Sequence, residues 1–315
     1  MSESALTPKK MLIIGESLLE FCQAEDGRFV LDYGGDVLTA GLYLSRLQEH
    51  TKLSIDFLTV VGNEPFSHKM VEYWKSEKIG VDLVTYAKGK APGSYIMRPD
   101  AEHPDYCYYR GNMASRDLFQ VKENIVLADS IDRYDYLYLS INTVNMLTHL
   151  DQETLLDLLH AANQKNLRIF LSCYYYPQIG SALVPIRNLI QRIWVHTDIC
   201  FVDFDNQQTF FPDENPADAV QRLCEWGIRE PLVTQNHHGY CYWDGKYRHQ
   251  ISLPKPENII DLTGGHYGFE AGYIAARLMG KSRVDAIRAG HQLSHSVMEH
   301  KGGILPANKM PKLFG

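Results

Sequence analysis

Residues 261–280 read DLTGGHYGFEAGYIAARLMG, a glycine-rich turn that leads directly into an amphipathic helical pattern. The first backbone N–H groups of a helix have no partner within the helix, and the helix dipole is positive at that end. A glycine-rich turn before a helix therefore predicts a position where an anion such as a phosphate group is bound. The turn here ends in His266 and Tyr267, so the side chains next to the anion position are unusual.

The composition is that of an ordinary folded protein. The chain has 315 residues, of which 45% are hydrophobic and 22% charged, and its net charge is −7. A negative net charge argues against broad binding to nucleic acid or to an anionic membrane surface. No apolar run approaches the length of about 18 residues that a membrane span needs. We expect neither a nucleic-acid nor a membrane partner.

The start of the chain and the cysteines indicate a cytoplasmic protein. The polar residues 1–9 are expected to form a disordered leader, and the apolar run behind them is too short for the core of a signal peptide. The six cysteines are scattered, with no C-x-x-C pair, which favours reduced thiols over a disulfide framework or a zinc site. No metal site is predicted from protein ligands alone.

Short apolar runs alternate with helical patterns along most of the chain. Continuous apolar runs typical of buried strands occupy 11–15, 54–62, 134–140, 168–173, 198–204 and 231–236. Amphipathic patterns occupy 37–48, 66–78, 151–165 and 216–227. This alternation predicts an α/β fold built on a mostly parallel, doubly wound sheet with helices on both faces, as a single domain over 10–315.

Two segments depart from this alternation. Residues 16–33 and 92–111 alternate polar and apolar positions and carry Gly, Pro and Asp at their turns, which predicts antiparallel strands. Two such excursions can pair into a small β-sheet. Because ligands of open α/β sheets bind at the carboxyl edge of the strands, we expect the small sheet to act as a lid over that edge.

Several motifs occur together in a characteristic order: IIGESLLEF (13–21), DYGGDVLTAGLYLSRL (32–47), FLTVVGNEPFSHKM (57–70), YDYLYLS (134–140), DLTGGHYGFEAGYIAARL (261–278) and GHQLSHSVMEHKGGILP (290–306). This order resembles the PfkB, or ribokinase-like, carbohydrate kinases over about 10–310, and among them it is most similar to the 2-keto-3-deoxygluconate kinases. The resemblance implies a ribokinase-like fold with a β-sheet lid, a sugar-acid site beneath the lid, and ATP with Mg²⁺ as phosphoryl donor and metal.

In such kinases the turn reads D-T-T-G-A-G-D or close to it, and its last Asp takes the proton from the sugar hydroxyl. Laid on this chain, the motif places Gly264 and Gly265 in the anion-binding turn, His266 at the second glycine, and Tyr267 at the catalytic Asp. A phenol ordinarily has a pKa near 10 and accepts a proton poorly at neutral pH. Two interpretations stay open: His266 or Tyr267 is a substitute base, or both are remnants that close the pocket.

The resemblance also assigns residues to the sugar and to the nucleotide. Its sugar-side positions are Gly34, Gly35, Asp36, Thr39, Tyr95, Arg110 and Tyr176. Tyr176 replaces an Arg that would clamp a carboxylate, and Arg110 is either a ligand of the sugar's carboxylate or a solvated charge of the lid. Its nucleotide positions are Asp205, Gln208, Gln235, His237 and Gly239. Gln208 replaces an acid of an N-x-x-E-like motif, and His237 replaces a glycine.

Four altered elements in one site argue against efficient catalysis. The sequence therefore predicts a sugar-kinase relative that phosphorylates 2-keto-3-deoxygluconate or a similar sugar acid weakly or not at all. The alternative is a non-catalytic protein that senses a sugar acid or serves as a scaffold for a partner. ATP and Mg²⁺ are required if the protein is active, and neither is needed if it is not. The aromatic run YCYYR (106–110) suggests association of identical chains through the lid.

Overall fold

The computed structural model describes residues 8–24, 26–98, 105–121, 124, 126–175 and 183–314. These residues group into two compact units. Unit 1 contains the described residues up to Arg116 and from Pro256 onward, and unit 2 contains those from Asp117 to Lys255. The expectation that both units belong to a single domain over 10–315 stays a prediction. Strand β1 begins at Lys9, inside the range expected to be a leader, and residues 1–7 lie outside the described residues.

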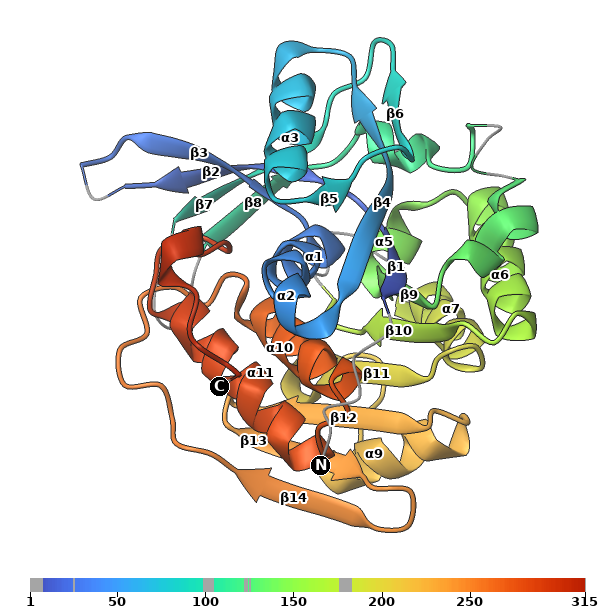
Figure 1. The fold of residues 1–315 in the computed structure, drawn as a ribbon, viewed down its shortest axis with the longest axis vertical. Helices are drawn as coiled ribbons and strands as arrows, with labels where there is room; N and C mark the ends of the chain where they lie inside the picture. The colour runs from blue at the N-terminus through green and yellow to red at the C-terminus, as the bar shows by residue number, and fades with distance from the viewer. Residues whose placement is uncertain are drawn as a thin grey trace. The chain divides into compact units, whose positions relative to one another are not determined.

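Unit 1 contains a parallel sheet (Figure 1). Strand β4 pairs in parallel with the other three strands of this sheet, which consists of β1 (Lys9–Ile14), β4 (Leu53–Gly62), β5 (Ile79–Gly80) and β6 (Val84–Ala87). The last four residues of β1, Met11–Ile14, are completely buried. A strand with both faces covered needs apolar side chains on both, which is why this one is a continuous apolar run rather than an alternating pattern.

The helices of unit 1 are α1 (Asp36–Arg46), α2 (Gln48–Thr51), α3 (Pro65–Ser76), α10 (Gly265–Leu278) and α11 (Arg283–Met298), with 3₁₀ turns at Ala114–Asp117 and Ala307–Lys309. Local chemistry fixes where they begin. Glu64 accepts hydrogen bonds from the backbone N–H groups of Phe66 and Ser67 at the start of α3, which is the usual role of a capping oxygen. The two C-terminal helices α10 and α11 lie side by side, and α10 also contacts α1 (Figure 1).

The two period-two segments form one four-stranded sheet, here called the small sheet. Its strand order is β3-β2-β7-β8, formed by β2 (Leu18–Gln23), β3 (Phe29–Gly34), β7 (Gly93–Arg98) and β8 (Asp105–Tyr109). The hairpins β2–β3 and β7–β8 are antiparallel, as predicted, but β2 and β7 pair in parallel. The difference arises because each segment folds into its own hairpin, and the two hairpins join through their first strands.

Unit 2 contains the remaining strands, in the order β14-β13-β12-β11-β10-β9. These are β9 (Tyr136–Ser140), β10 (Arg168–Ser172), β11 (Ile199–Asp203), β12 (Glu230–Gln235), β13 (Gly239–Trp243) and β14 (Arg248–Ser252). The first four are parallel neighbours, and β13 and β14 continue the sheet as an antiparallel hairpin extension. The sequence prediction of strands ended at 236 and missed β13 and β14, whose mixed polar and aromatic residues form no continuous apolar run.

The helices of unit 2 are α5 (Ile141–Met146), α6 (His149–Gln164), α7 (Leu183–Trp194), α8 (Phe204–Gln207) and α9 (Pro216–Glu225), with a 3₁₀ segment at Val126–Arg133. Helix α9 begins at Pro216, as predicted, with Asn215 as its cap.

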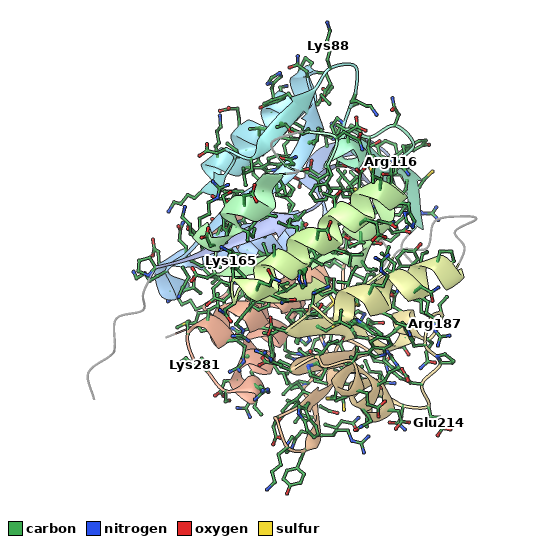
Figure 2. All side chains as sticks on the ribbon, turned by 90° about the vertical axis from the view of Figure 1, so that its right-hand side faces the viewer. Lys88, Arg116, Lys165, Arg187, Glu214 and Lys281 are labelled. Atoms are coloured by element: carbon green, nitrogen blue, oxygen red, sulfur yellow. The ribbon has the colours of Figure 1, made fainter. Side chains whose placement is uncertain are left out.

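No helix among the described residues is long and apolar enough to cross a membrane. Charged side chains of both signs are exposed, among them Lys88, Lys165, Arg187, Glu214 and Lys281 (Figure 2).

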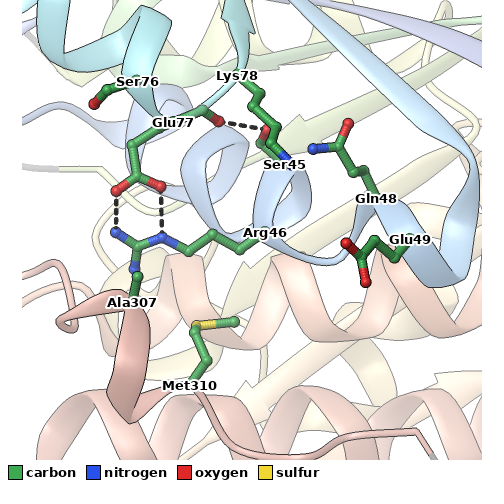
Figure 3. Close-up of a pocket in the computed structure, with 9 residues that line it drawn as sticks. All are labelled: Ser45, Arg46, Gln48, Glu49, Ser76, Glu77, Lys78, Ala307 and Met310. Atoms are coloured by element: carbon green, nitrogen blue, oxygen red, sulfur yellow. Dashed lines mark hydrogen bonds and ion pairs between the residues drawn. The ribbon is translucent and has the colours of Figure 1, made fainter.

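A pocket in unit 1 is built around one ion pair (Figure 3). Arg46 of α1 donates two hydrogen bonds to the carboxylate of Glu77, at 2.6 and 2.7 Å, and a third to the carbonyl oxygen of Leu305. Both side chains are largely buried. A bidentate pair of this kind fixes geometry as well as charge, so it ties α1 to the end of α3 and to the segment that follows α11.

Candidate functional site

The glycine-rich turn before α10 is held in a conformation that only glycine adopts easily. Gly264 is the N-cap of α10 and has a φ of +77°. A Cβ atom at this position would lie 2.4 Å from the carbonyl oxygen of Gly303 and 2.6 Å from its Cα. The backbone of the turn therefore packs directly on the backbone of residues 302–303, which leaves no room for a side chain between them.

Asp261 holds these two backbone segments together. Its carboxylate is completely buried and accepts hydrogen bonds from the N–H of Thr263 at 2.9 Å and from the N–H of Gly302 at 2.8 Å. On α1, the hydroxyl of Tyr43 donates to the carbonyl of Gly303 and accepts from the N–H of Leu305, both at 2.9 Å. The turn and the segment after α11 therefore form one rigid substructure, as a site that binds a charged group requires.

Helix α10 carries His266 and Tyr267 in its first turn. His266 is half-buried, and Tyr267 is buried with 5% of its surface exposed. A Cβ at Gly268 would lie 2.9 Å from a methyl carbon of Val297, so α10 and α11 approach closely just behind this turn. The N-terminus of α10 has the backbone donors and the dipole that favour an anion. The buried phenol of Tyr267 occupies the place that the motif gives to a carboxylate base.

Arg110 is a buried, paired residue, so the interpretation of it as a solvated charge is wrong. Only 7% of its surface is exposed, and a guanidinium nitrogen lies 2.6 Å from Oε1 of Glu16. Its guanidinium also stacks over the ring of Tyr108 at 4.4 Å. Burial alone would lower the pKa of Arg110, but the carboxylates of Glu16 and Asp36 outweigh burial and raise it above its ordinary value.

Glu16, which the sequence analysis did not select, is the partner of Arg110. Burial raises its pKa to about 7, although Arg110 opposes this effect, and the nearby carboxylate of Asp36 raises it further. Among the described residues, Oε2 of Glu16 and Nε of Arg110 are buried without a hydrogen-bond partner. The sequence does contain a signal for Glu16, because it is an acid directly after an apolar strand, in IIGESLLEF. A buried charge at such a position costs free energy unless it is paired or hydrogen-bonded.

Glu20 is a second buried carboxylate that the sequence analysis did not select. It accepts a hydrogen bond from the hydroxyl of Tyr95, which is itself buried on β7 of the small sheet. Burial raises the pKa of Glu20 to about 7, while the hydrogen bonds from Tyr95 and the backbone of Gly303 oppose the rise. A Cβ at Gly34 would lie 3.2 Å from the hydroxyl oxygen of Tyr95. Tyr95 therefore both packs in the core and points its hydroxyl at the site.

The second glycine of the pair places the start of α1 against Glu16. Gly35 has a φ of +138°, and a Cβ there would lie 2.5 Å from the carbonyl oxygen of Glu16. Asp36 and Thr39, in the first turn of α1, are both buried, and the N–H of Thr39 donates to the carbonyl of Gly35. The Gly-Gly-Asp element thus brings the backbone of α1 directly beside the pair formed by Glu16 and Arg110.

The small sheet contacts the glycine-rich turn through its last strand. The hydroxyl oxygens of Tyr106 on β8 and Thr263 in the turn lie 2.7 Å apart. The rings of Tyr95, Tyr106 and Tyr108 form a cluster with centroids 5.3–6.1 Å apart. This aromatic surface next to buried carboxylates is suited to a carbohydrate, which has both C–H faces and hydroxyl groups. Tyr176, the remaining sugar-side candidate, lies outside the described residues.

The nucleotide candidates lie in unit 2, where the structure adds one buried acid to them. Asp205 is an exposed residue of α8, and Gln208 donates its amide to the carbonyl of Asp213. The acid at the end of β11 is Asp203, which is more than half-buried and caps α8 by accepting the N–H of Asn206. Burial raises the pKa of Asp203 to about 6. Because ligands bind at strand ends, Asp203 is a further candidate beside Asp205, and the assignment of Asp205 to the nucleotide stays a prediction.

The hairpin between β12 and β13 carries the other three nucleotide candidates. Gln235 and Gly239 pair across the hairpin, and His237 lies in its turn with a φ of +57°. This left-handed conformation is the one that glycine adopts at least cost, which fits the assignment of His237 to a glycine position. The described residues contain no cluster of three or more His, Cys, Asp or Glu side chains suited to a metal.

Unit 1 thus brings a glycine-rich turn at a helix N-terminus together with a cluster of aromatic and acidic side chains. The chain belongs to the pfkB family of carbohydrate kinases, whose model matches residues 9–310. It is 27% identical over 309 residues to the 2-dehydro-3-deoxygluconokinase of Escherichia coli K12, covering 96% of this chain and 99% of that protein.

Solved structures show the same ribokinase-like fold. The 2-dehydro-3-deoxygluconokinase of Thermotoga maritima superposes with a TM-score of 0.78 at 16% identity, covering 94% of this chain and 96% of that one. A ribokinase II from E. coli, solved with ATP and Mg²⁺, superposes with a TM-score of 0.77 at 17% identity, covering 94% of each chain. The family and fold predictions from the sequence are therefore confirmed.

The buried carboxylate of Glu20 leads to a prediction about pH and stability. Its pKa of about 7 in the folded state exceeds the ordinary value of 4.5, so the folded state binds this proton more tightly than the unfolded state. The resulting stabilisation is complete below pH 4.5 and is lost as the pH rises through 7. We expect wild type to gain about 1 kcal/mol per pH unit, relative to Glu20→Gln, as the pH falls from 7 to 5. Urea unfolding of both proteins at pH 5, 6, 7 and 8 measures this difference. A difference that does not vary with pH would contradict it.

Proposed function

We propose that this carbohydrate kinase binds a small sugar acid such as 2-keto-3-deoxygluconate beneath the small sheet and phosphorylates it slowly with ATP. The observation that carries the proposal is the contrast between the two halves of the site. On the sugar side, Glu16, Glu20, Tyr95 and Arg110 are buried, oriented and close to the glycine turn. At the position of the base stands the phenol of Tyr267.

The donor side supports a phosphate ligand. A Cβ at Gly264 or Gly265 would collide with Gly303 or Met298, so this turn has bare backbone at the start of α10. The residues present thus fit a transferring phosphoryl group, which ATP would supply with Mg²⁺ as its counter-ion. Gly264 and Gly265 would orient and stabilise that group. The chain's own residues would position the sugar and keep water away from it.

Because a phenol and not a carboxylate stands at the position of the base, we expect slow turnover. Kinases of this general kind turn over at about 1–100 s⁻¹, and loss of a general base costs about 10²–10⁴-fold. We therefore expect a kcat between about 10⁻⁴ and 1 s⁻¹ with 2-keto-3-deoxygluconate, measured as ADP formed in excess of a reaction without sugar. A kcat of about 10 s⁻¹ or more would contradict the proposal of slow turnover.

A pair of variants distinguishes the two interpretations of His266. If His266 is a substitute base, His266→Ala lowers the rate by about 10²-fold and shifts its pH dependence, whereas Tyr267→Phe leaves the rate unchanged. If both residues are remnants, neither substitution lowers the rate by more than a few-fold.

The second candidate function is a non-catalytic sugar-acid sensor, favoured by the assembled sugar side. It predicts that 2-keto-3-deoxygluconate at 100 times its Kd stabilises the protein by about 2.7 kcal/mol. It also predicts that Mg·ATP adds little stability and that no ADP forms. Thermal unfolding with each ligand separates the two functions, because strong stabilisation by Mg·ATP favours the kinase.

A further inference from the structure

The guanidinium of Arg110 already has a carboxylate partner within the chain. Glu16 lies 2.6 Å from one of its terminal nitrogens, and both side chains are almost fully buried, with exposed fractions of 2% and 6%. Glu16 comes from the segment between β1 and β2, and Arg110 directly follows β8. A substrate carboxylate is attracted most strongly by an arginine whose charge is not already offset by an acid, and Glu16 offsets the charge of Arg110.

Among the described residues, the cations that act on Glu16 are matched by carboxylates, which disfavours an anionic ligand. Arg110 and Arg116 act on Glu16 as cations, and Asp36 acts on it as an anion. The phenols of Tyr108 and Tyr267 face Arg110 from β8 and α10 and add no positive charge. When Glu16 is ionised, its charge and the carboxylate of Asp36 offset the charges of the two arginines. A sugar carboxylate would then enter a buried site beside two carboxylates, which is unfavourable at low dielectric.

The pair formed by Glu16 and Arg110 does not satisfy all of its own hydrogen-bonding atoms. Oε2 of Glu16 and Nε of Arg110 are buried and have no hydrogen-bond partner among the described residues. A purely structural ion pair in the interior normally satisfies such atoms. Here one acceptor and one donor remain available beside the glycine pair and the aromatic cluster, where a ligand with hydroxyl groups could use both.

We propose that Glu16 determines the charge of the ligand that this site accepts: a sugar acid binds only when Glu16 is protonated, whereas a neutral sugar of the same shape binds with Glu16 ionised. This inference rests on the proposed function and specifies its substrate class. When the sugar carboxylate pairs with Arg110, Glu16 loses its counter-ion and takes up one proton from solvent. A neutral sugar leaves the pair formed by Glu16 and Arg110 intact.

The matched probes are 2-keto-3-deoxygluconate and 3-deoxyfructose, which has a hydroxymethyl group in place of the carboxylate. Because the pKa of Glu16 is about 7, the affinity of wild type for the acid should fall about tenfold between pH 6 and pH 8. The affinity for 3-deoxyfructose should change less than threefold. Calorimetry at pH 8 in buffers of different ionisation enthalpy should show uptake of about 0.9 proton per acid bound and none for the neutral sugar.

Glu16→Gln removes the competing charge. We expect this variant to bind the acid at least tenfold more tightly than wild type at pH 8, without proton uptake, while binding of 3-deoxyfructose changes little. Glu153→Gln is the matched control, because Glu153 is an exposed carboxylate paired with Arg192 in unit 2, and it should leave both affinities unchanged. The measurements on wild type need no variant, so they decide the question even if Glu16→Gln does not fold.

Two kinds of result would overturn this inference. Binding of the acid by wild type that is independent of pH and involves no proton uptake would show that Glu16 does not compete. A loss of acid affinity in Glu16→Gln would show that Glu16 only positions Arg110. Either result leaves the proposed function standing. If neither compound binds, the proposed function fails and this inference fails with it.

Discussion

Replacing Tyr267 with Asp, together with His266→Gly, is expected to raise the rate of sugar-acid phosphorylation by about 10²–10⁴-fold, which is the typical contribution of a general base. The new carboxylate would stand in the first turn of α10, in the electrostatic reach of Arg110, which already interacts with Tyr267. A carboxylic acid has an ordinary pKa of about 4, so at neutral pH the new carboxylate could accept the proton of the sugar hydroxyl. The measurement is ADP formation with ATP, Mg²⁺ and 2-keto-3-deoxygluconate.

The matched control is Tyr267→Asn with His266→Gly. Asn has the size of Asp but cannot accept a proton at neutral pH, so this control should stay near the rate of wild type. If the Asp and Asn variants are equally fast, the gain comes from opening the pocket, and the assignment of position 267 to the base is wrong. If only the Asp variant is fast, position 267 is the place of the base, and the native chain is slow because it lacks a carboxylate there.

Gly264→Ala is expected to lower the free energy of unfolding by about 2–4 kcal/mol. About 1 kcal/mol comes from the positive φ, which a residue with a Cβ adopts at a cost. The remainder comes from the collision with Gly303, where the new methyl group would lie 2.4–2.9 Å from three backbone atoms. Because backbone atoms cannot rotate away as side chains do, the turn or the 302–303 segment must shift, and overpacking of this kind costs about 1–3 kcal/mol.

Gly280→Ala supplies the control for backbone strain alone. Gly280 has a φ of +75°, almost the same as Gly264, but a Cβ there would meet nothing within 4 Å. It should therefore cost only about 1 kcal/mol. Urea unfolding of both variants isolates the effect of the close approach. Equal losses would mean that the turn and residues 302–303 do not pack as tightly as the structure shows.

The sequence alone determined the class of fold and the order of most of its elements, although it did not reveal the hairpin of β13 and β14. Buried strands such as β1 are continuous apolar runs, and helices such as α3 and α9 begin at Pro after a capping residue. Both kinds of element can therefore be recognised from local residue patterns. The turn at 264–265 was also identified in this way, as glycines directly before a helical pattern, whereas the Gly-Gly pair at 34–35 was assigned by the resemblance. A backbone that must approach another backbone requires glycine whatever surrounds it.

Only the tertiary structure decided how the charged residues of the site are used. Arg110 was open to two interpretations in the sequence, and the structure shows it buried against Glu16, a residue from a distant part of the chain. Glu16, Glu20 and Asp203 went unselected, because burial and charge neighbours are absent from a local pattern. The ionisation of a carboxylate depends on desolvation and on nearby charges, and both are set by segments that meet only when the chain has folded.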